Sequence, residues 1–214
     1  MSTLRTITGF KSKLTGGGAR PNLFEVSIPS FPVSAAAAGW TSLTEDFQFL
    51  CKTAALPAST ISPIDVPFRG RILKVAGDRT FDVWTVTVIN DENFKIRSAF
   101  EIWMNSISKL DNNTGATDPN SYMTNAVVHQ LGRGADKLKE SKSNSNISTG
   151  NIIKPLRTYQ FYGIFPTSIS AIDLSYDTSD TIEEYTVEFQ VQYWTAGNSQ
   201  DSGGANDQTG ILIT

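Results

Sequence analysis

Residues 75–107 decide the fold, and their first half reads Val75-Ala76-Gly77-Asp78-Arg79-Thr80-Phe81-Asp82-Val83-Trp84-Thr85-Val86-Thr87-Val88-Ile89. Every second residue from Trp84 to Val88 is apolar, and the two residues between them, Thr85 and Thr87, carry hydroxyl groups. This period of two places an apolar set on one face of a strand and the hydroxyls on the other. We therefore predict one long strand over residues 75–89.

A helix is predicted to follow this strand directly. Between them lies Asn90-Asp91-Glu92-Asn93, in which Asn90 or Asp91 is expected to cap the helix and Glu92 to lie in its first turn, near the positive end of the dipole. The apolar residues of the helix recur at three- and four-residue spacing: Ile96, Ala99, Phe100, Trp103 and Ile107. This spacing forms one apolar stripe, so the helix is expected to lie across a sheet. The predicted core residues are Trp84, Phe100, Trp103 and Phe189.

Alternation and turn residues predict further strands along the chain. They cover residues 22–28, 47–51, a basic segment around Gly70, 122–131, 152–164, 170–176 and 185–193. In the second of these, Phe47, Phe49 and Cys51 are expected on one face, with Cys51 buried. Residues 56–67 are interrupted by prolines and are expected to be extended without forming a central strand. The chain is therefore predicted to be mainly β.

The composition bounds the domain organisation. A chain of 214 residues with 18% charged residues favours one β-rich domain with a substantial core. We expect an N-terminal arm over residues 1–18, a β domain over 19–195 with a loop insertion at about 137–151, and a flexible tail over 196–214. The tail is rich in Gly, Asn, Ser and Asp, so it is disordered or ordered only by a partner.

Charge is distributed unevenly. Residues 158–214 contain eight acids and neither Lys nor Arg, while residues 1–157 contain 13 acids and all 18 bases, which gives −8 and +5. This asymmetry either places opposite charges across subunit contacts or gives one surface a single sign. The alternative is chance combined with acidic turns.

Catalytic and cofactor-binding sites are not indicated. Cys51 is the single cysteine and His129 the single histidine, so neither a disulfide nor a metal site of usual type is expected. The glycines at 16–18 are not followed by the Lys-Ser/Thr pair of a phosphate loop. We predict no enzyme activity, no catalytic residue, no cofactor and no metal. No signal peptide or apolar span is found, so assembly in the cytoplasm without integral membrane association is expected.

Several colinear runs resemble the tail tube protein of T-even-type contractile-tailed bacteriophages. In chain order they are Ala19-Arg20-Pro21-Asn22-Leu23-Phe24, Cys51-Lys52-Thr53-Ala54-Ala55-Leu56-Pro57-Ala58, residues 75–81, Trp84-Thr85-Val86-Thr87-Val88, Asn90-Asp91-Glu92, Phe165-Pro166-Thr167 and Tyr193-Trp194. Together they span residues 19–194, and colinear runs of this extent are more specific than any one short motif.

The resemblance implies a β-barrel or sandwich protomer with one packed α-helix, whose strands join a ring-wide inner barrel in a hexamer, as in the related tubes of type VI secretion. It also implies stacked rings that form a tube inside a contractile sheath, built on a baseplate around a tape-measure protein, and transient non-specific passage of genome DNA. The location implied is the virion tail, with assembly in the host cytoplasm. Two alternatives remain: a baseplate tube initiator that forms one ring, and a β-sandwich binding module on a virion surface outside the family.

Two sets of residues are candidates for the assembly. The first is a polar strand face expected to line the lumen, or else to be ordinary solvated outer surface: Thr85, Thr87, Glu184, Thr186, Glu188, Gln190 and Gln192. The second combines apolar and proline residues with bases expected at contacts between subunits or rings: Leu4, Ile7, Phe10, Leu14, Leu56, Pro57, Ile61, Arg69, Arg71 and Arg79. Because acids are interspersed among these bases, subunit contacts or a solvated face are favoured over a phosphate-binding surface.

Overall fold

The computed structural model describes residues 6–14, 17–32, 43–135, 153–177 and 179–198. The helices are α1 (Ile7–Lys13), α3 (Leu43–Leu50), α4 (Lys95–Ile107) and α5 (Pro119–Tyr122). The strands are β1 (Phe24–Ser27), β2 (Cys51–Ala54), β3 (Ser59–Phe68), β4 (Arg71–Phe81), β5 (Trp84–Ile89), β6 (Thr124–Ala135), β7 (Ile153–Ile169), β8 (Glu184–Gln190) and β9 (Tyr193–Asn198). The prediction of a mainly β chain is confirmed.

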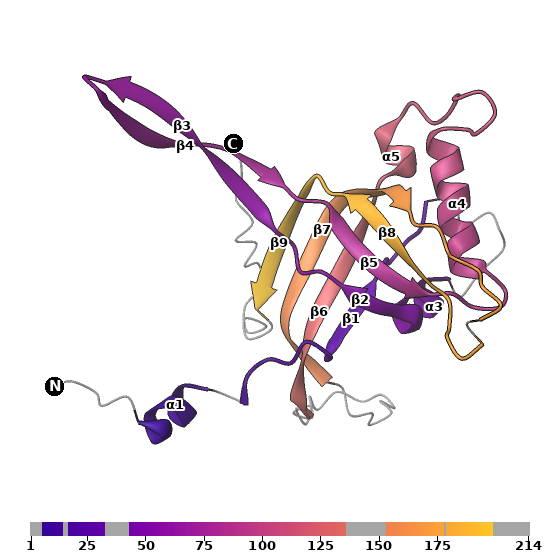
Figure 1. The fold of residues 1–214 in the computed structure, drawn as a ribbon, viewed down its shortest axis with the longest axis horizontal. Coiled ribbons are helices and arrows are strands. Elements are labelled where there is room, and N and C mark those ends of the chain that lie inside the picture. Colours follow the sequence, from indigo (N-terminus) through magenta and orange to yellow (C-terminus); the bar gives the residue numbers. More distant parts are fainter. Residues whose placement is uncertain (1–5, 15–16, 33–42, 136–152, 178, 199–214) are drawn as a thin grey trace, which may run out of the picture. The chain divides into compact units, whose positions relative to one another are not determined.

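Two sheets contain these strands (Figure 1). The larger sheet has seven strands in the order β1-β6-β7-β8-β5-β2, with β9 also paired to β7, and the smaller is the two-stranded hairpin β3–β4. By its internal contacts the chain divides into one compact unit of residues 1–25, 128–158 and 196–214 and a second of residues 26–127 and 159–195. The candidate assembly surfaces lie mostly in the second unit.

The core of the second unit forms where α4 packs on the sheet. Trp84, Phe100, Trp103 and Phe189 are all buried, and the Trp103 and Phe189 ring centroids lie 6.1 Å apart. The Trp84 Nε1–H donates to the Ala55 carbonyl at 2.9 Å and the Trp103 Nε1–H to the Tyr122 carbonyl at 2.7 Å. Each indole is therefore buried without leaving its polar group unsatisfied.

The predicted long strand over residues 75–89 is instead two strands. Asp82 and Val83 separate β4 from β5, and the two strands belong to different sheets. Trp84, Val86 and Val88 are buried between β2 and β8, whereas β4 pairs only with β3 and is largely exposed. The apolar residues change parity at this break, from Phe81 and Val83 to Trp84 and Val86, so the alternation of β5 begins at Trp84 and does not extend back into β4.

The strand predicted over residues 47–51 is wrong, because residues 43–50 form helix α3. Leu43 and Phe47 are buried at helical spacing, and Phe49 is 77% exposed. The Phe47 ring meets that of Phe100 edge to face at 5.9 Å, so α3 packs against α4. Cys51 begins β2 and is buried, as predicted.

The start of α4 differs in detail from the prediction. The N-cap is neither Asn90 nor Asp91 but Phe94, which has φ of 54° and makes no side-chain cap hydrogen bond. The Asp91 carboxylate, three residues earlier, accepts a hydrogen bond from the Lys95 backbone N–H at 3.1 Å. Glu92 lies before the helix, and the first turn contains no acid. Asn90 instead bonds to Glu183, through its backbone N–H to the Glu183 carbonyl and through Nδ2 to the carboxylate, both at 2.9 Å.

Three other predicted strands change in the structure. Arg69 and Gly70 are not within a strand but form the turn of the β3–β4 hairpin, with φ of 45° and 82°. Both angles are positive, as a tight hairpin turn requires. Residues 170–176 form no strand despite their alternation, and the last predicted strand ends at Gln190, with β9 starting at Tyr193.

Candidate assembly surfaces

A polar face covers one side of β5 and β8. Their antiparallel register places Thr85 opposite Glu188 and Thr87 opposite Thr186. The residues between them, such as Val86 and Val187, are buried, and the Phe189 ring lies 5.6 Å from that of Phe100 in α4. Since the apolar face meets α4, the threonines and Glu188 point away from it. None of these four polar residues is buried.

Neighbouring strands extend this polar face. Thr53 of β2 lies opposite Thr87, and Ser168 of β7 lies opposite Glu188. Lys52 forms an ion pair with Glu184, so the base at this edge of the face is matched by an acid. The resulting surface carries mainly hydroxyl groups and carboxylates.

The two glutamines of the predicted lumen set lie at the end of the face. Gln190 is the last residue of β8 and is half-buried. Gln192 follows the strand, and its Cγ lies 2.7 Å from where a Cβ at Gly163 would stand. Gly163 has φ of +60°, so a side chain there would be strained and would also displace Gln192. Because β8 ends at Gln190, the alternation of polar and apolar residues stops there and Gln192 is not part of the strand face.

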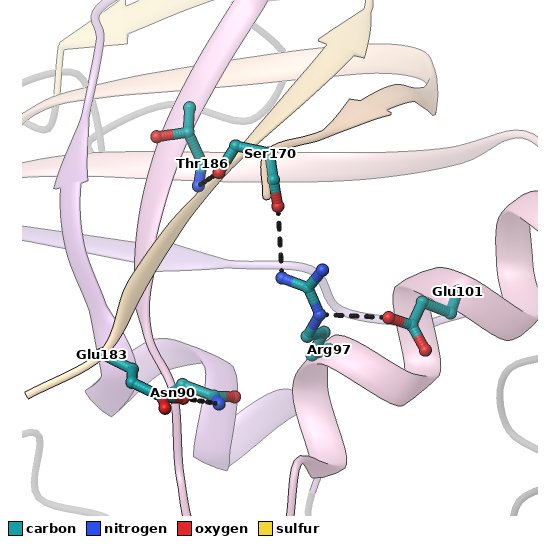
Figure 2. Close-up of polar contacts among 6 residues, drawn as sticks. All are labelled: Asn90, Arg97, Glu101, Ser170, Glu183 and Thr186. Carbon is teal, nitrogen blue, oxygen red and sulfur yellow. Dashed lines mark hydrogen bonds and ion pairs between the residues drawn. The ribbon is translucent and has the colours of Figure 1, made fainter. Parts of the chain in front are cut away.

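Polar contacts join α4 to β8 and to residue 170 at the Ile89 end of β5 (Figure 2). Arg97 Nε donates to Glu101 at 3.0 Å, and Arg97 Nη1 donates to the Ser170 carbonyl at 3.3 Å. The Ser170 Oγ in turn accepts from the Thr186 backbone N–H at 2.9 Å. The Arg97 guanidinium also lies 5.2 Å from the Tyr185 ring centroid, and burial of Tyr185 raises the pKa of its hydroxyl. Ser170 is therefore held at the start of the segment between β7 and β8, and the Asn90–Glu183 hydrogen bond holds its end.

The β3–β4 hairpin is exposed along nearly its whole length, with only Gly77 and Phe81 half-buried. All ten residues of β3 are exposed. The register pairs Ile64 with Val75 and Val66 with Leu73 on one face, and Phe68 with Arg71 beside the turn. Phe68 is 67% exposed and Leu73 62% exposed. Contiguous apolar side chains left open to water in this way are typical of a protein–protein contact surface.

Bases surround the tip of this hairpin. The Arg69 guanidinium lies 5.4 Å from the Phe68 ring centroid, and Lys74 forms an ion pair with Asp65 at 2.7 Å. The tip encloses a shallow hollow of about 510 Å³ lined by Phe68, Arg69, Arg71, Ile72 and Leu73. Sequence reasoning selected the arginines but missed Phe68, Ile72 and Leu73. The alternation of Ile64, Val66 and Phe68 was a usable signal, although three prolines in the same segment obscured it.

The other predicted contact residues lie in several places. Leu56 and Ile61 are exposed, and Pro57 is half-buried. Ile7, Phe10 and Leu14 are exposed on or next to α1, which belongs to the first unit, and Leu4 lies outside the described residues. Thr6 caps α1 by accepting from the Gly9 N–H at 3.1 Å. The insertion at 137–151 and the tail beyond 198 also fall outside the described residues.

Cys51 and His129 carry side chains of the kinds often used in catalysis or metal binding. Burial raises the pKa of the Cys51 thiol to about 12, which removes the reactive thiolate at neutral pH. His129 Nδ1 lies 2.9 Å from Thr158 Oγ1. Within the described ranges, no three His, Cys, Asp or Glu residues come together as a metal site would require. Among the helices of that same part of the chain, none has the length and apolar character needed to cross a membrane.

Comparison with known proteins identifies the family. A family model described as phage tail tube protein matches residues 19–197. The chain is 32% identical over 180 residues to the tail tube protein gp19 of Enterobacteria phage T4, covering 84% of this chain and 93% of that protein. It is 25% identical over 189 residues to the tail tube protein of Serratia phage KSP90, covering 87% and 94%.

Solved structures show the same fold. A chain of the anti-feeding prophage cap, which terminates a tube, superposes with a TM-score of 0.54 at 14% identity, covering 85% of this chain and 91% of that chain. A chain of the baseplate of the same particle gives a TM-score of 0.51 at 14% identity, covering 85% and 97%. With the family model covering most of the chain and a relative above 30% identity, the chain belongs to the phage tail tube protein family.

Proposed function

We propose that this chain forms the inner tail tube of a contractile-tailed phage by stacking hexameric rings, and that the tube is the conduit for DNA ejection. The observation that carries the proposal is the β3–β4 hairpin, whose apolar face has no cover within the described chain. Removing such a face from water contributes about 25 cal/mol for each Å², from which the costs of association are subtracted. A structural protein that meets further copies of itself provides that burial.

The polar face of β5 and β8 is proposed to line the lumen of each ring. It carries Thr85, Thr87, Thr186 and Glu188 in one register, with Glu184 and Gln190 at its two ends and Gln192 beyond it. Carboxylates and hydroxyls suit a conduit because carboxylates repel DNA phosphates and uncharged hydroxyls form no ion pairs with them. A wall of Lys or Arg would release counterions from DNA and hold it.

The outer alternative for this face remains a distinct hypothesis. A solvated face on the outside of the ring would also be polar, because strand alternation separates two faces without saying which one points to the axis. A tube in which Glu188 is outside would leave DNA ejection unaffected by its charge.

The proposed partners follow from the same role. They are further copies of the chain, the sheath around the tube, and the tape-measure and baseplate proteins at which the tube begins. The protein is proposed to reside in the virion tail after assembly in the host cytoplasm, and DNA passes through it transiently and without sequence preference. No catalytic, cofactor or metal-binding role is proposed.

Purified protein viewed by negative-stain electron microscopy tests this function. Extended tubes are expected. Lone rings at every protein concentration would instead indicate the baseplate tube initiator, and monomers would contradict both. A virion-surface binding module outside the family is no longer supported, because the chain belongs to the family.

A further inference from the structure

A single base lies among the strands that carry the polar face. The strands β2, β5 and β8 contain one Lys or Arg, which is Lys52, and two acids, Glu184 and Glu188. The part of β7 that belongs to the second unit, residues 159–169, adds neither a base nor an acid. If this face lines a conduit for DNA, Lys52 is the one side chain of these strands that attracts phosphates.

A β-bulge places Lys52 on the polar face. Cys51 lies opposite Val88 and is buried. The next paired residue of β2, Thr53, lies opposite Thr87 of the polar face, so Lys52 is an extra residue in β2. In such a bulge two residues oppose one partner, which interrupts the alternation, and both Lys52 and Thr53 are exposed.

Glu184 pairs with the Lys52 ammonium group. The two side chains form an ion pair, although β5 lies between the strands β2 and β8 that carry them. Two strand spacings amount to roughly 10 Å, so the pair extends across β5 along the surface of the sheet. Glu184 lies opposite Ile89 and has the same parity as Thr186 and Glu188. The charge of the base is therefore cancelled by a carboxylate of the same face.

Folding stability does not account for this ion pair. The Lys52 side chain is 49% exposed and that of Glu184 35% exposed. Ion pairs this open to water contribute little to stability, because water and salt screen them. Among the salt bridges of the described residues, none involves Glu188. The two carboxylates of the face thus differ: Glu184 neutralises a base, and Glu188 leaves a net negative charge.

We infer that Glu184 masks Lys52, so that the lining of the conduit presents no free ammonium group to passing DNA. Glu188 supplies the charge that repels phosphates, and Glu184 adds none, because Lys52 cancels it. A free lysine repeated in every copy would bind phosphates and release counterions all along the tube. The inference rests on the proposed position of this face in the lumen and assigns a separate role to each carboxylate.

Glu184→Gln and Glu188→Gln are a matched pair of variants. Each removes one negative charge from the same face and nearly preserves the shape of the side chain. Glu184→Gln is expected to slow DNA ejection by more than about twofold at low salt, and by less at high salt, because it frees Lys52 to bind phosphates. Glu188→Gln leaves the ion pair intact and should eject at close to the wild-type rate. Equal rates for the two variants would overturn the masking role.

Removal of the lysine provides a rescue. Lys52→Met alone is expected to eject DNA at the wild-type rate or faster, and Lys52→Met added to Glu184→Gln should restore the wild-type rate, since no base is left to mask. A pair that only held β2 against β8 would behave differently. In that case Lys52→Met would be as harmful as Glu184→Gln and the double variant would not recover, which would contradict the inference.

The reactivity of Lys52 gives a second measurement, made on the unassembled subunit. Acylation of Lys52 by a small amine reagent, located by peptide mass spectrometry, should rise by about two- to fivefold in Glu184→Gln, as release from an exposed ion pair permits. It should stay unchanged in Glu188→Gln. Lys109, which is exposed in another part of the chain, serves as the internal reference. Equal acylation of Lys52 in the wild type and in Glu184→Gln would overturn the mask.

The outcomes distinguish the masking role from the position of the face in the lumen. Slow ejection by Glu188→Lys together with normal ejection by Glu184→Gln would keep this face in the lumen and overturn the mask. Normal ejection by both variants would contradict the lumen position, and with it the inference. Failure of the wild-type chain to form tubes would contradict the proposed function itself.

Discussion

The β5–β8 sheet and the β3–β4 hairpin have the same local pattern and opposite environments. Both alternate apolar and polar residues, yet Trp84, Val86 and Val88 are buried, whereas Ile64, Val66 and Phe68 are exposed. The sheet has α4 against its apolar face, whereas no helix among the described residues covers the hairpin. Alternation therefore predicts which residues share a face, while burial depends on whether another element, or another copy, covers that face.

The largest expected effect comes from the buried side chains between α4 and the sheet. Trp103→Ala should lower the free energy of unfolding of the unassembled subunit by about 3–5 kcal/mol, because the indole is buried and its removal leaves a cavity. Phe68→Ala on the hairpin is the matched control and should change it by less than about 0.5 kcal/mol. Urea unfolding followed by tryptophan fluorescence measures both. Equal losses would remove the distinction between the two regions.

The hairpin should instead affect assembly. Val66→Ser/Leu73→Ser removes a cross-strand apolar pair from the exposed face and is expected to leave the subunit folded while reducing the mass of tubes more than tenfold. Thr60→Ala/Thr80→Ala alters another cross-strand pair of the same hairpin and serves as the control. Sedimentation of the polymer and circular dichroism of the subunit give the two readouts. Normal tube yield from the serine variant would show that the apolar face is not a contact.

The N-terminal arm of the first unit also exposes apolar side chains. α1 exposes Ile7 and Phe10 and buries none of its residues. Deleting residues 2–15 is expected to give a folded subunit that polymerises poorly, because the arm would dock on a neighbouring copy. Tube length by negative stain, compared with Ile7→Ser/Phe10→Ser in the full chain, measures the effect. Tubes of normal length from the deletion would contradict a docking role.

The polar face is expected to affect transport more than assembly. Glu188→Lys should give tubes of normal length with slower DNA ejection, because a lysine ring in the lumen attracts phosphates. Glu188→Gln removes the charge without reversing it and is the control. Glu184→Lys is a poorer test because it would also break the ion pair between Glu184 and Lys52. Ejection timed in phage particles gives the measurement. Normal ejection together with failed sheath attachment would place this face on the outside.

The smallest expected effect concerns Cys51. Its pKa in the folded state is raised to about 12 by burial, from 9.0 in the open chain, so above pH 9 the unfolded chain loses a proton that the folded chain keeps. Stability from this group is therefore complete below pH 9 and falls as the pH rises toward 12. Between pH 9 and 10 the loss should approach about 1 kcal/mol. Urea unfolding at both values should show a smaller fall for Cys51→Ala, and an identical fall would exclude the thiol.

The sequence predicted the parts of the fold whose pattern is long and consistent. The α4 stripe and the apolar face of β5 and β8 extend over two or more turns or several alternating residues, so only one interpretation fits. Phe47, Phe49 and Cys51 show the opposite case: three alternating apolar residues fit a strand, yet Leu43 and Phe47 fit a helix equally well. The packing of Phe47 on Phe100 favours the helix, and these two residues lie more than 50 positions apart in the chain.

The candidate surfaces were predictable in a similar, partial way. The polar residues of β5 and β8 could be assigned to one face each, but their joint register, Thr85 with Glu188, depends on strand pairing that a single sequence does not give. The hairpin turn at Arg69 and Gly70 was mistaken for a strand because a two-residue turn leaves almost no gap between two extended segments. The sequence analysis did not predict the apolar hairpin face, because the prolines at 63 and 67 argue against a central strand. β3 tolerates these prolines because it is an edge strand.

The position of the hairpin at one end of β5 gives any stack built through it a polarity. In such a stack the hairpins at one end would stay uncovered, so the two ends would offer different chemistry to the proteins that start and stop growth. A subunit added in the reverse orientation would not present its hairpin to the stack, which would make elongation directional without any energy source.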